Sequence, residues 1–218
     1  MLKLENVCYR YKNSNNNVLK NLNVHFEAGK LNAILGPSGS GKTTLLSIMA
    51  GLDRPTSGTV LIDGDNLAHM DLDKYRRERI SVIFQAFQLF PLLTAIENVC
   101  YPMEVNGANK MRIIKKAEIL LESVGITADK HNRYPSNLSG GEQQRVAIAR
   151  ALSTGAKVIL ADEPTGNLDK ANGDAVISML KSLAHTHKYC VIVVTHSMDV
   201  AEISDVVYRM SDGTIRLV

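Results

Sequence analysis

Gly36-Pro37-Ser38-Gly39-Ser40-Gly41-Lys42-Thr43 fits the pattern G-x-x-x-x-G-K-[ST], in which glycines let the backbone wrap around a phosphate group. An apolar run, Leu31 to Leu35, precedes this loop, and a segment with helical spacing, Thr44 to Ala50, follows it. The N–H groups at the start of that helix would supply positive potential, Lys42 would reach the outer phosphates, and the Thr43 hydroxyl would bind Mg²⁺. The sequence therefore predicts nucleotide binding, without indicating what the nucleotide drives.

Apolar segments on either side of this loop predict two kinds of sheet. Compact apolar runs separated by helical spacing are typical of a parallel sheet covered on both faces, and they occupy Leu31 to Leu35, Ile80 to Phe84, Val158 to Ala161 and Cys190 to Thr195. Segments with a period of two predict antiparallel strands, and they occupy Leu2 to Tyr11, Leu22 to Phe26 and Thr59 to Ile62. A polar turn at 13–17 and a terminal hairpin at Ser211-Asp212-Gly213 are also expected.

The segment between Phe87 and Thr154 has mostly helical spacing, and we interpret it as a lobe inserted into the α/β core. We therefore predict a single α/β domain over residues 1–218. A P-loop NTPase core with a mostly parallel sheet, together with an N-terminal antiparallel β subdomain, would comprise 1–86 and 155–218. An inserted α-helical subdomain would comprise 87–154.

Composition excludes several classes of protein. Lys and Arg number 25 against 22 Asp and Glu, a net charge of +3 without a long basic run, so we expect no nucleic-acid partner. The three cysteines, Cys8, Cys100 and Cys190, form no C-x-x-C pair, which argues against a disulfide framework or a zinc site. A reducing, cytoplasmic compartment follows. The apolar runs are of strand length, far short of the roughly 20 residues that span a bilayer.

Two carboxylates end one of the predicted parallel strands. Asp162 and Glu163 directly follow Val158 to Ala161, at the edge of the sheet where the phosphate loop also lies. An Asp-Glu pair at a strand end is more often a solvated turn, but the phosphate loop earlier in the chain favours a catalytic interpretation. Asp162 would then hold Mg²⁺, and Glu163 would polarise the attacking water as general base.

Leu138-Ser139-Gly140-Gly141-Glu142 predicts a second helix start that can bind an anion. Ser139 is a plausible N-cap, and the two glycines leave backbone N–H groups exposed. Taken alone, the segment would be an ordinary loop–helix junction. Its position between the other two motifs favours a functional interpretation, in which one chain carries two phosphate-binding elements.

The phosphate loop, the Leu138–Glu142 motif and the Asp162–Glu163 pair follow one another along the chain in the order typical of the ATP-binding cassette (ABC) family. The chain resembles that family along nearly its whole length. The resemblance implies that the catalytic residues are Lys42, Gln85, Glu163 and the switch histidine His196. It implies that Mg²⁺ is bound by Thr43, Gln85 and Asp162. The residues that it implies to bind ATP are Tyr11, which would stack on adenine, Gly36, Pro37, Ser38, Gly39, Ser40, Gly41, Lys42, Thr43, Thr44, Leu138, Ser139, Gly140, Gly141, Glu142 and Asp169.

Leu138 to Glu142 resembles the signature motif of the ABC family, in which the signature of one subunit closes over the nucleotide held by the other. The resemblance therefore implies a head-to-tail homodimer around two ATP molecules. Two departures from the family pattern are mild. Glu142 stands where glutamine is commonest, and Gly166-Asn167 precedes Leu168-Asp169, where small residues such as serine and alanine are frequent. Neither departure removes a catalytic group.

Three of the implied site residues also have ordinary structural interpretations. Tyr11 could be a strand aromatic, since Tyr9 lies two residues away on the same face, and Gln85 could be a surface polar residue. A lone histidine is more often structural, but His196 directly follows an apolar strand at the sheet edge where the phosphates would lie. We interpret all three as functional residues.

A transport function would require a separate membrane permease. Its predicted contact is Gln85 to Val99, which includes apolar residues such as Phe90 and Leu92, although each of these could instead pack inside the helical lobe. Pro91 to Val99, together with the signature, resembles the bacterial branch of macrolide efflux, lipoprotein release, antimicrobial-peptide resistance and cell division.

Three functions are compatible with these residues. The expected one is an ATPase motor at the inner face of the cell membrane, driving a permease in export, extraction or mechanotransmission. The second is a regulatory ATPase that signals through a membrane partner to a cell-wall enzyme or sensor. A soluble ABC ATPase of DNA repair or translation is disfavoured, because such proteins usually carry a long coiled coil or two cassettes. The sequence does not identify the substrate.

Overall fold

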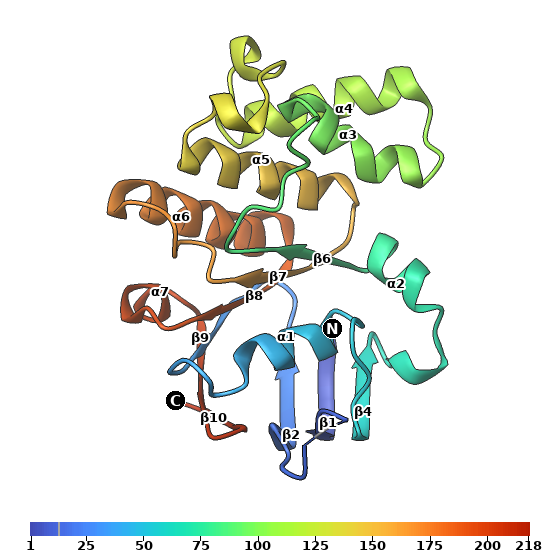
Figure 1. The fold of residues 1–218 in the computed structure, drawn as a ribbon, viewed down its shortest axis with the longest axis vertical. Coiled ribbons are helices and arrows are strands. Elements are labelled where there is room, and N and C mark those ends of the chain that lie inside the picture. The colour runs from blue at the N-terminus through green and yellow to red at the C-terminus, as the bar shows by residue number, and fades with distance from the viewer. Residues whose placement is uncertain (13) are drawn as a thin grey trace.

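A computed structural model describes residues 1–12 and 14–218, which form two sheets and the helices around them (Figure 1). The strands are β1 (Leu2–Tyr9), β2 (Leu19–Phe26), β3 (Leu31–Leu35), β4 (Ser57–Ile62), β5 (Asp65–Asn66), β6 (Ile80–Ile83), β7 (Val158–Asp162), β8 (Cys190–Thr195), β9 (Val206–Ser211) and β10 (Thr214–Leu217). The α-helices are α1 (Lys42–Met49), α2 (Leu72–Glu78), α3 (Ala95–Val105), α4 (Lys110–Ser123), α5 (Gly140–Ser153), α6 (Lys170–His187) and α7 (Met198–Glu202). Single turns of 3-10 helix lie at Leu67–His69, Ala128–Lys130 and Pro135–Asn137.

The larger sheet has the strand order β10-β9-β3-β8-β7-β6 and is parallel except for β10. Every residue of β3 and β8 is buried, because helices cover both faces of the sheet: α5 and α6 lie on one side and α1 on the other (Figure 1). The carboxyl ends of parallel strands meet at one edge of a sheet. The segments that follow β3, β6, β7 and β8 therefore converge there.

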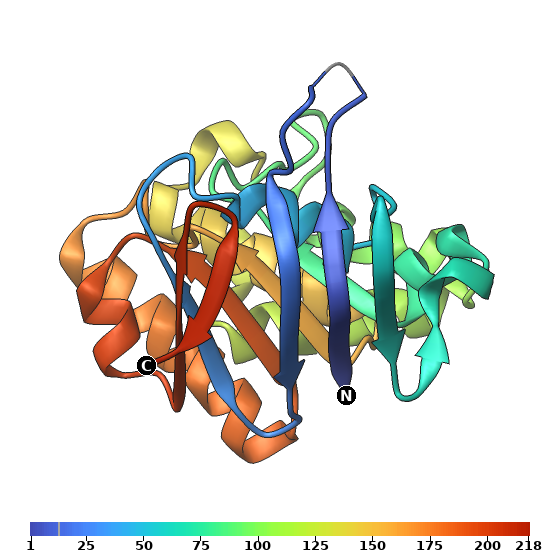
Figure 2. The same cartoon turned by 90° about the horizontal axis from the view of Figure 1, so that it is seen from below.

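The smaller sheet has the order β2-β1-β4-β5 and is antiparallel throughout (Figure 2). Its apolar side chains, including Leu4, Phe26 and Ile62, share one core with Leu45 of α1 and Ile192 of the larger sheet. Helix α1 is thus enclosed between the two sheets. The polar turn predicted at 13–17 includes Asn13, which lies outside the described residues.

Helices α3 to α6 form a second core against the opposite face of the larger sheet. Val99 of α3, Leu121 of α4, Ile148 of α5 and Ile177 of α6 are all buried in it, together with Ile159 of β7. Each of these helices begins directly after a residue whose side chain caps the helix N-terminus, so a residue type favoured at N-caps marks every start. Helix α5 consequently runs from the Leu138–Glu142 motif to the neighbourhood of β6.

The predicted fold class is confirmed, with an antiparallel sheet, a mostly parallel sheet and helices on both faces of the parallel sheet. Several boundaries differ by a few residues. Strand β1 ends at Tyr9 rather than Tyr11, because the Val18 N–H donates to the Tyr9 carbonyl at 2.8 Å and closes the hairpin there. Strand β7 continues to Asp162, which pairs with Val194 of β8.

The division of the chain into a core (1–86 and 155–218) and a helical subdomain (87–154) stays a prediction. Over the residues that the structure describes, no helix combines the length and the apolar character that crossing a membrane requires.

Candidate active site

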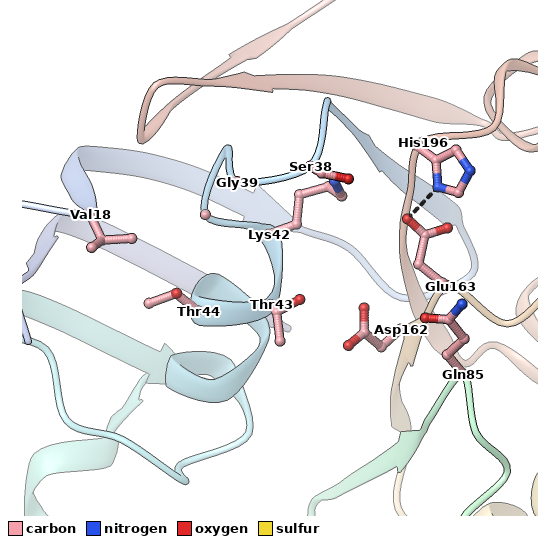
Figure 3. A pocket seen from close by; sticks show the side chains of 11 residues that line it. Val18, Ser38, Gly39, Lys42, Thr43, Thr44, Gln85, Asp162, Glu163 and His196 are labelled. Carbon is pink, nitrogen blue, oxygen red and sulfur yellow. Dashed lines mark hydrogen bonds and ion pairs between the residues drawn. The ribbon is translucent and has the colours of Figure 1, made fainter. Parts of the chain in front are cut away.

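A cavity of about 440 Å³ opens at the edge of the larger sheet where the parallel strands end (Figure 3). Its lining comes from the residue before β2, from the loop after β3 together with the start of α1, and from the ends of β6, β7 and β8. The lining residues are Val18, Ser38, Gly39, Gly41, Lys42, Thr43, Thr44, Gln85, Asp162, Glu163 and His196. Five segments far apart in the sequence therefore contribute to one site. We did not predict Val18 from the sequence, because nothing in its local pattern distinguishes it from an ordinary strand residue.

The loop after β3 has the conformation that its glycines predict. Gly41 has φ 103°, in the left-handed region that favours glycine, and α1 begins at the next residue. A Cβ atom on Gly36 would collide with the Met210 carbonyl oxygen, so the loop packs against β9 at that point. The first turn of α1 carries no acidic residue, which leaves the positive potential of its N-terminus uncompensated.

The Lys42 side chain reaches back from α1 to the start of the phosphate loop. Its Nζ donates to the carbonyl oxygens of Gly36 at 2.7 Å and Pro37 at 3.0 Å, and the residue is only 8% exposed. These bonds hold a buried positive charge at the lining of the cavity. Such a charge beside exposed backbone N–H groups attracts phosphate oxygens.

Glu163 occupies a constrained position at the opposite wall of the cavity. Its backbone has φ 44°, a left-handed conformation that costs a non-glycine residue free energy and recurs at functional sites. Thr195 Oγ1 donates to Glu163 Oε2 at 3.1 Å, and His196 Nδ1 lies 2.8 Å from Oε1 (Figure 3). Both carboxylate oxygens are thereby oriented by the end of β8.

Asp162 differs from Glu163 in its surroundings. Burial raises the pKa of Asp162, the neighbouring Glu163 carboxylate raises it further, and Lys42 opposes both effects. The Asp162 carboxylate, the Thr43 hydroxyl and the Gln85 amide all line the same cavity. These three groups offer oxygen ligands, and a bound cation would stabilise the ionised form of the Asp162 carboxylate. The set therefore fits a hard divalent ion such as Mg²⁺.

Gln85 is held by its backbone rather than by its side chain. Asn167 Nδ2 donates to the Gln85 carbonyl at 2.9 Å, and a Cβ atom on Gly166 would come within 2.7 Å of Gln85 Nε2. The segment 166–167, which departs from the family pattern in sequence, thus packs against Gln85 at the start of the loop between β6 and α3, called the Gln85 loop below. That contact joins residues 82 positions apart, so sequence spacing could not indicate it.

Tyr11 lies beside the phosphate loop but does not line the cavity. Its hydroxyl is 3.0 Å from Thr44 Oγ1, and its ring meets the Tyr9 ring edge-on at a centroid distance of 5.0 Å. The half-exposed ring is therefore fixed at the start of α1. Stacking on adenine stays a prediction.

The Leu138–Glu142 motif lies outside the cavity, as does Asp169. Ser139 caps α5, as predicted, and the structure shows that the cap is reciprocal: the Glu142 N–H donates to Ser139 Oγ at 3.3 Å, and the Ser139 N–H donates to Glu142 Oε2 at 2.8 Å. The Asn172 side chain packs against Gly141, where a Cβ atom would come within 2.4 Å of Asn172 Oδ1. Asp169 caps α6 by accepting a hydrogen bond from the Asn172 N–H at 3.0 Å. The site residues predicted from the sequence thus form two separate groups within one chain.

Glu142 should make the stability of α5 depend on pH. Lys130 Nζ lies 2.7 Å from Glu142 Oε1 and, with the Ser139 N–H, lowers the pKa of Glu142 from 4.5 to about 2. A depressed carboxyl pKa stabilises the fold above the unfolded-state value, and this contribution is lost as pH falls toward the folded-state value. We expect Glu142→Gln, which preserves the cap, to be less stable than the wild type by about 1 kcal/mol at pH 7.

Urea titrations of both proteins at several pH values would measure this difference. It should shrink by half or more between pH 7 and pH 3, because Glu142 is then protonated in the unfolded chain. A difference that stays constant over this range would show that the Lys130 ion pair does not stabilise the helix.

A phosphate-binding loop, a buried lysine, and an oriented glutamate at the end of a neighbouring strand define a P-loop nucleoside triphosphatase. Comparison with known proteins refines this class: the family model described as "ABC transporter" matches residues 19–166. The chain belongs to the ABC transporter family, and it is an ATP-binding ATPase. The resemblance inferred from the three motifs is confirmed.

Named relatives cover most of the chain. It is 41% identical over 207 residues to the lipoprotein-releasing system ATP-binding protein LolD 2 of Rhodopirellula baltica, covering 91% of this chain and 81% of that protein. It is 40% identical to the macrolide export ATP-binding/permease protein MacB of Brucella melitensis, covering 99% of this chain but only 34% of that longer protein.

A solved structure reproduces the fold in detail. The dimeric post-hydrolysis ATP-binding cassette MJ0796, a protein of Methanocaldococcus jannaschii bound there to ADP and Pi, superposes with a TM-score of 0.91. The two chains are 40% identical, and the match covers 100% of this chain and 98% of that one.

Proposed function

We propose that this chain is the motor subunit of an ABC transporter, that it forms a head-to-tail homodimer around two ATP molecules, and that the dimer drives a separate membrane permease. The observation that carries the proposal is the separation of the two phosphate-binding elements. The phosphate loop lines the cavity, whereas the Ser139 helix start does not. A second copy can supply the missing element, and the dimeric MJ0796 structure supports that arrangement.

In the proposed reaction, the chain's own groups perform the binding and the proton transfer. Lys42 and the loop N–H groups bind the outer phosphates of ATP. Glu163, oriented by Thr195 and His196, accepts a proton from the attacking water. Mg²⁺, held by Thr43, Asp162 and Gln85, would neutralise phosphate charge when bound. Ser139 of the second copy completes the enclosure of the phosphates.

The proposed permease contact is a groove between the α/β core and helices α3 to α5, called the helical layer below. It has a volume of about 300 Å³, and its walls include Leu52, Arg76, Phe90, Tyr101 and Arg150. Phe90 is 40% exposed and Leu52 is 55% exposed, so apolar side chains face solvent on both walls. The groove adjoins Gln85 through the same loop. A short helical segment of a permease, entering the groove, would thus contact the part of the chain that reaches the nucleotide.

The names of the relatives support export or extraction as the work that is driven. LolD is named for lipoprotein release and MacB for macrolide export, and MacB is named as an ATP-binding and permease protein in one. On this proposal the chain is peripheral at the inner face of the cell membrane.

Purification of the tagged chain from detergent-solubilised membranes of its own cells tests the permease contact. We expect an integral membrane protein to co-purify, and we expect Leu52→Glu to reduce its recovery about tenfold, because a charge would be buried in the groove. Ile119→Glu on α4 is the matched control, since Ile119 is 57% exposed but lies outside the groove. Recovery of DNA or ribosomes without any membrane protein would refute the proposal.

A further inference from the structure

Arg150, in the last turn of α5, holds two consecutive backbone carbonyl groups of the loop that follows Gln85. Its Nη1 donates to the Gln88 carbonyl at 2.6 Å, and its Nη2 donates to the Phe87 carbonyl at 3.1 Å. A planar guanidinium can make two such bonds at once, whereas a lysine ammonium cannot reproduce this geometry. The contact joins residues 62 and 63 positions apart in the chain.

The two carbonyl groups belong to a strained turn. Phe87 has φ 60° and Gln88 has φ 51°, so two adjacent residues other than glycine adopt the left-handed conformation. Each such residue costs about 1 kcal/mol or more and persists only where its surroundings hold it in place. Arg150 supplies that restraint on one side, and the Asn167 bond to the Gln85 carbonyl supplies it on the other.

Arg150 is also part of the groove. Its guanidinium carbon lies 5.8 Å from the centre of the Phe90 ring, and the Phe90 ring packs against Tyr101 at a centroid distance of 4.7 Å. A segment that packs on Phe90 would therefore lie beside the Arg150 contact. On the other wall, Arg76 Nη1 donates to the Gly51 carbonyl at 2.6 Å.

From these contacts we propose that Arg150 is a positioning residue for ATP hydrolysis, which holds the Phe87–Gln88 turn so that the Gln85 side chain stays at the cavity. The same contact is the path by which occupation of the groove changes the position of Gln85, a part of the inference that rests on the proposed function. Ser139 caps the start of α5 and Arg150 lies in its last turn, about 16 Å further along the helix. The signature and the Gln85 loop are thus joined by a rigid element.

A double-mutant cycle with Gln85 tests the positioning role in the purified chain. Arg150→Met keeps the aliphatic stem and removes the guanidinium, and we expect it to lower kcat about tenfold while KM for ATP changes less than about twofold. In a Gln85→Ala background the same substitution should lower kcat less than about twofold, because the residue that Arg150 positions is already gone. Arg150→Lys should restore little activity.

Lys116→Met is the matched control. Lys116 Nζ donates to the Ser153 carbonyl in the same part of α5 but does not contact the Gln85 loop, so this variant should keep its kcat. Equal losses of kcat from Arg150→Met in both backgrounds, or an equal loss in Lys116→Met, would show that Arg150 only stabilises the helical layer. The cycle uses no permease, so failure of the proposed permease contact would leave its result intact.

A spectroscopic measurement tests the inference without turnover. The chain contains no tryptophan, so Phe90→Trp would introduce a single reporter beside Arg150. We expect its emission to shift when ATP and Mg²⁺ are added, and we expect Arg150→Met to abolish that shift while ATP still binds. A shift of unchanged size in Arg150→Met would overturn the proposal.

Discussion

Glu163→Gln should reduce steady-state ATP hydrolysis about a thousandfold while leaving ATP affinity nearly unchanged. Glutamine has the size of glutamate and keeps the left-handed backbone position, but it cannot accept a proton from water. General-base catalysis contributes factors of roughly 10² to 10⁴, which places the expected loss in that range. Because ATP would then persist between two copies, the variant should accumulate as a nucleotide-bound dimer.

Phosphate release and size-exclusion chromatography with ATP and Mg²⁺ measure the two halves of this expectation. Glu118→Gln is the matched control, since Glu118 is an exposed carboxylate on α4, outside the cavity. The control should hydrolyse ATP at the wild-type rate and form no stable dimer. Normal hydrolysis by Glu163→Gln would contradict the role assigned to Glu163 and direct attention to Asp162 or His196 as the base.

The sequence predicted well those parts of the site that depend on local spacing. The phosphate loop, the carboxylates after β7 and the histidine after β8 each follow an apolar strand, and parallel strands deliver their carboxyl ends to one edge. The Ser139 cap is also local, because both of its bonds join residues three positions apart. For these residues, the strand or helix pattern contains enough information to place the side chain.

Contacts between distant segments could not be predicted in this way. Arg150 fitted the helical spacing of its segment, and nothing in that spacing indicates that its guanidinium leaves the helix to hold two carbonyl groups. Asn167 was noted only as a departure from the family pattern, yet its side chain anchors Gln85. Both contacts depend on how the helical layer packs on the sheet, which is a property of the tertiary structure.

The separation of Ser139 from the cavity leads to the second large effect. Ser139→Arg should leave ATP affinity of the monomer within about twofold of the wild type, because no atom of the Leu138–Glu142 motif lines the cavity of its own chain. The same substitution should prevent the dimer from closing, since a long cation would occupy the place where the phosphates held by the other copy must approach. Hydrolysis should therefore fall at least a hundredfold.

The Glu163→Gln background makes this expectation measurable, because its dimer is the stable species on ATP binding. Adding Ser139→Arg should return that variant to a monomer on size-exclusion chromatography, whereas Ser123→Arg, an exposed serine at the end of α4, should leave the dimer intact. Loss of the Ser139 cap costs about 1 kcal/mol by itself, so thermal unfolding must show that the helix remains folded. If Ser139→Arg instead weakened ATP binding in the monomer as strongly as it weakened the dimer, both phosphate-binding elements would act on one nucleotide within one chain. The head-to-tail arrangement would then be wrong.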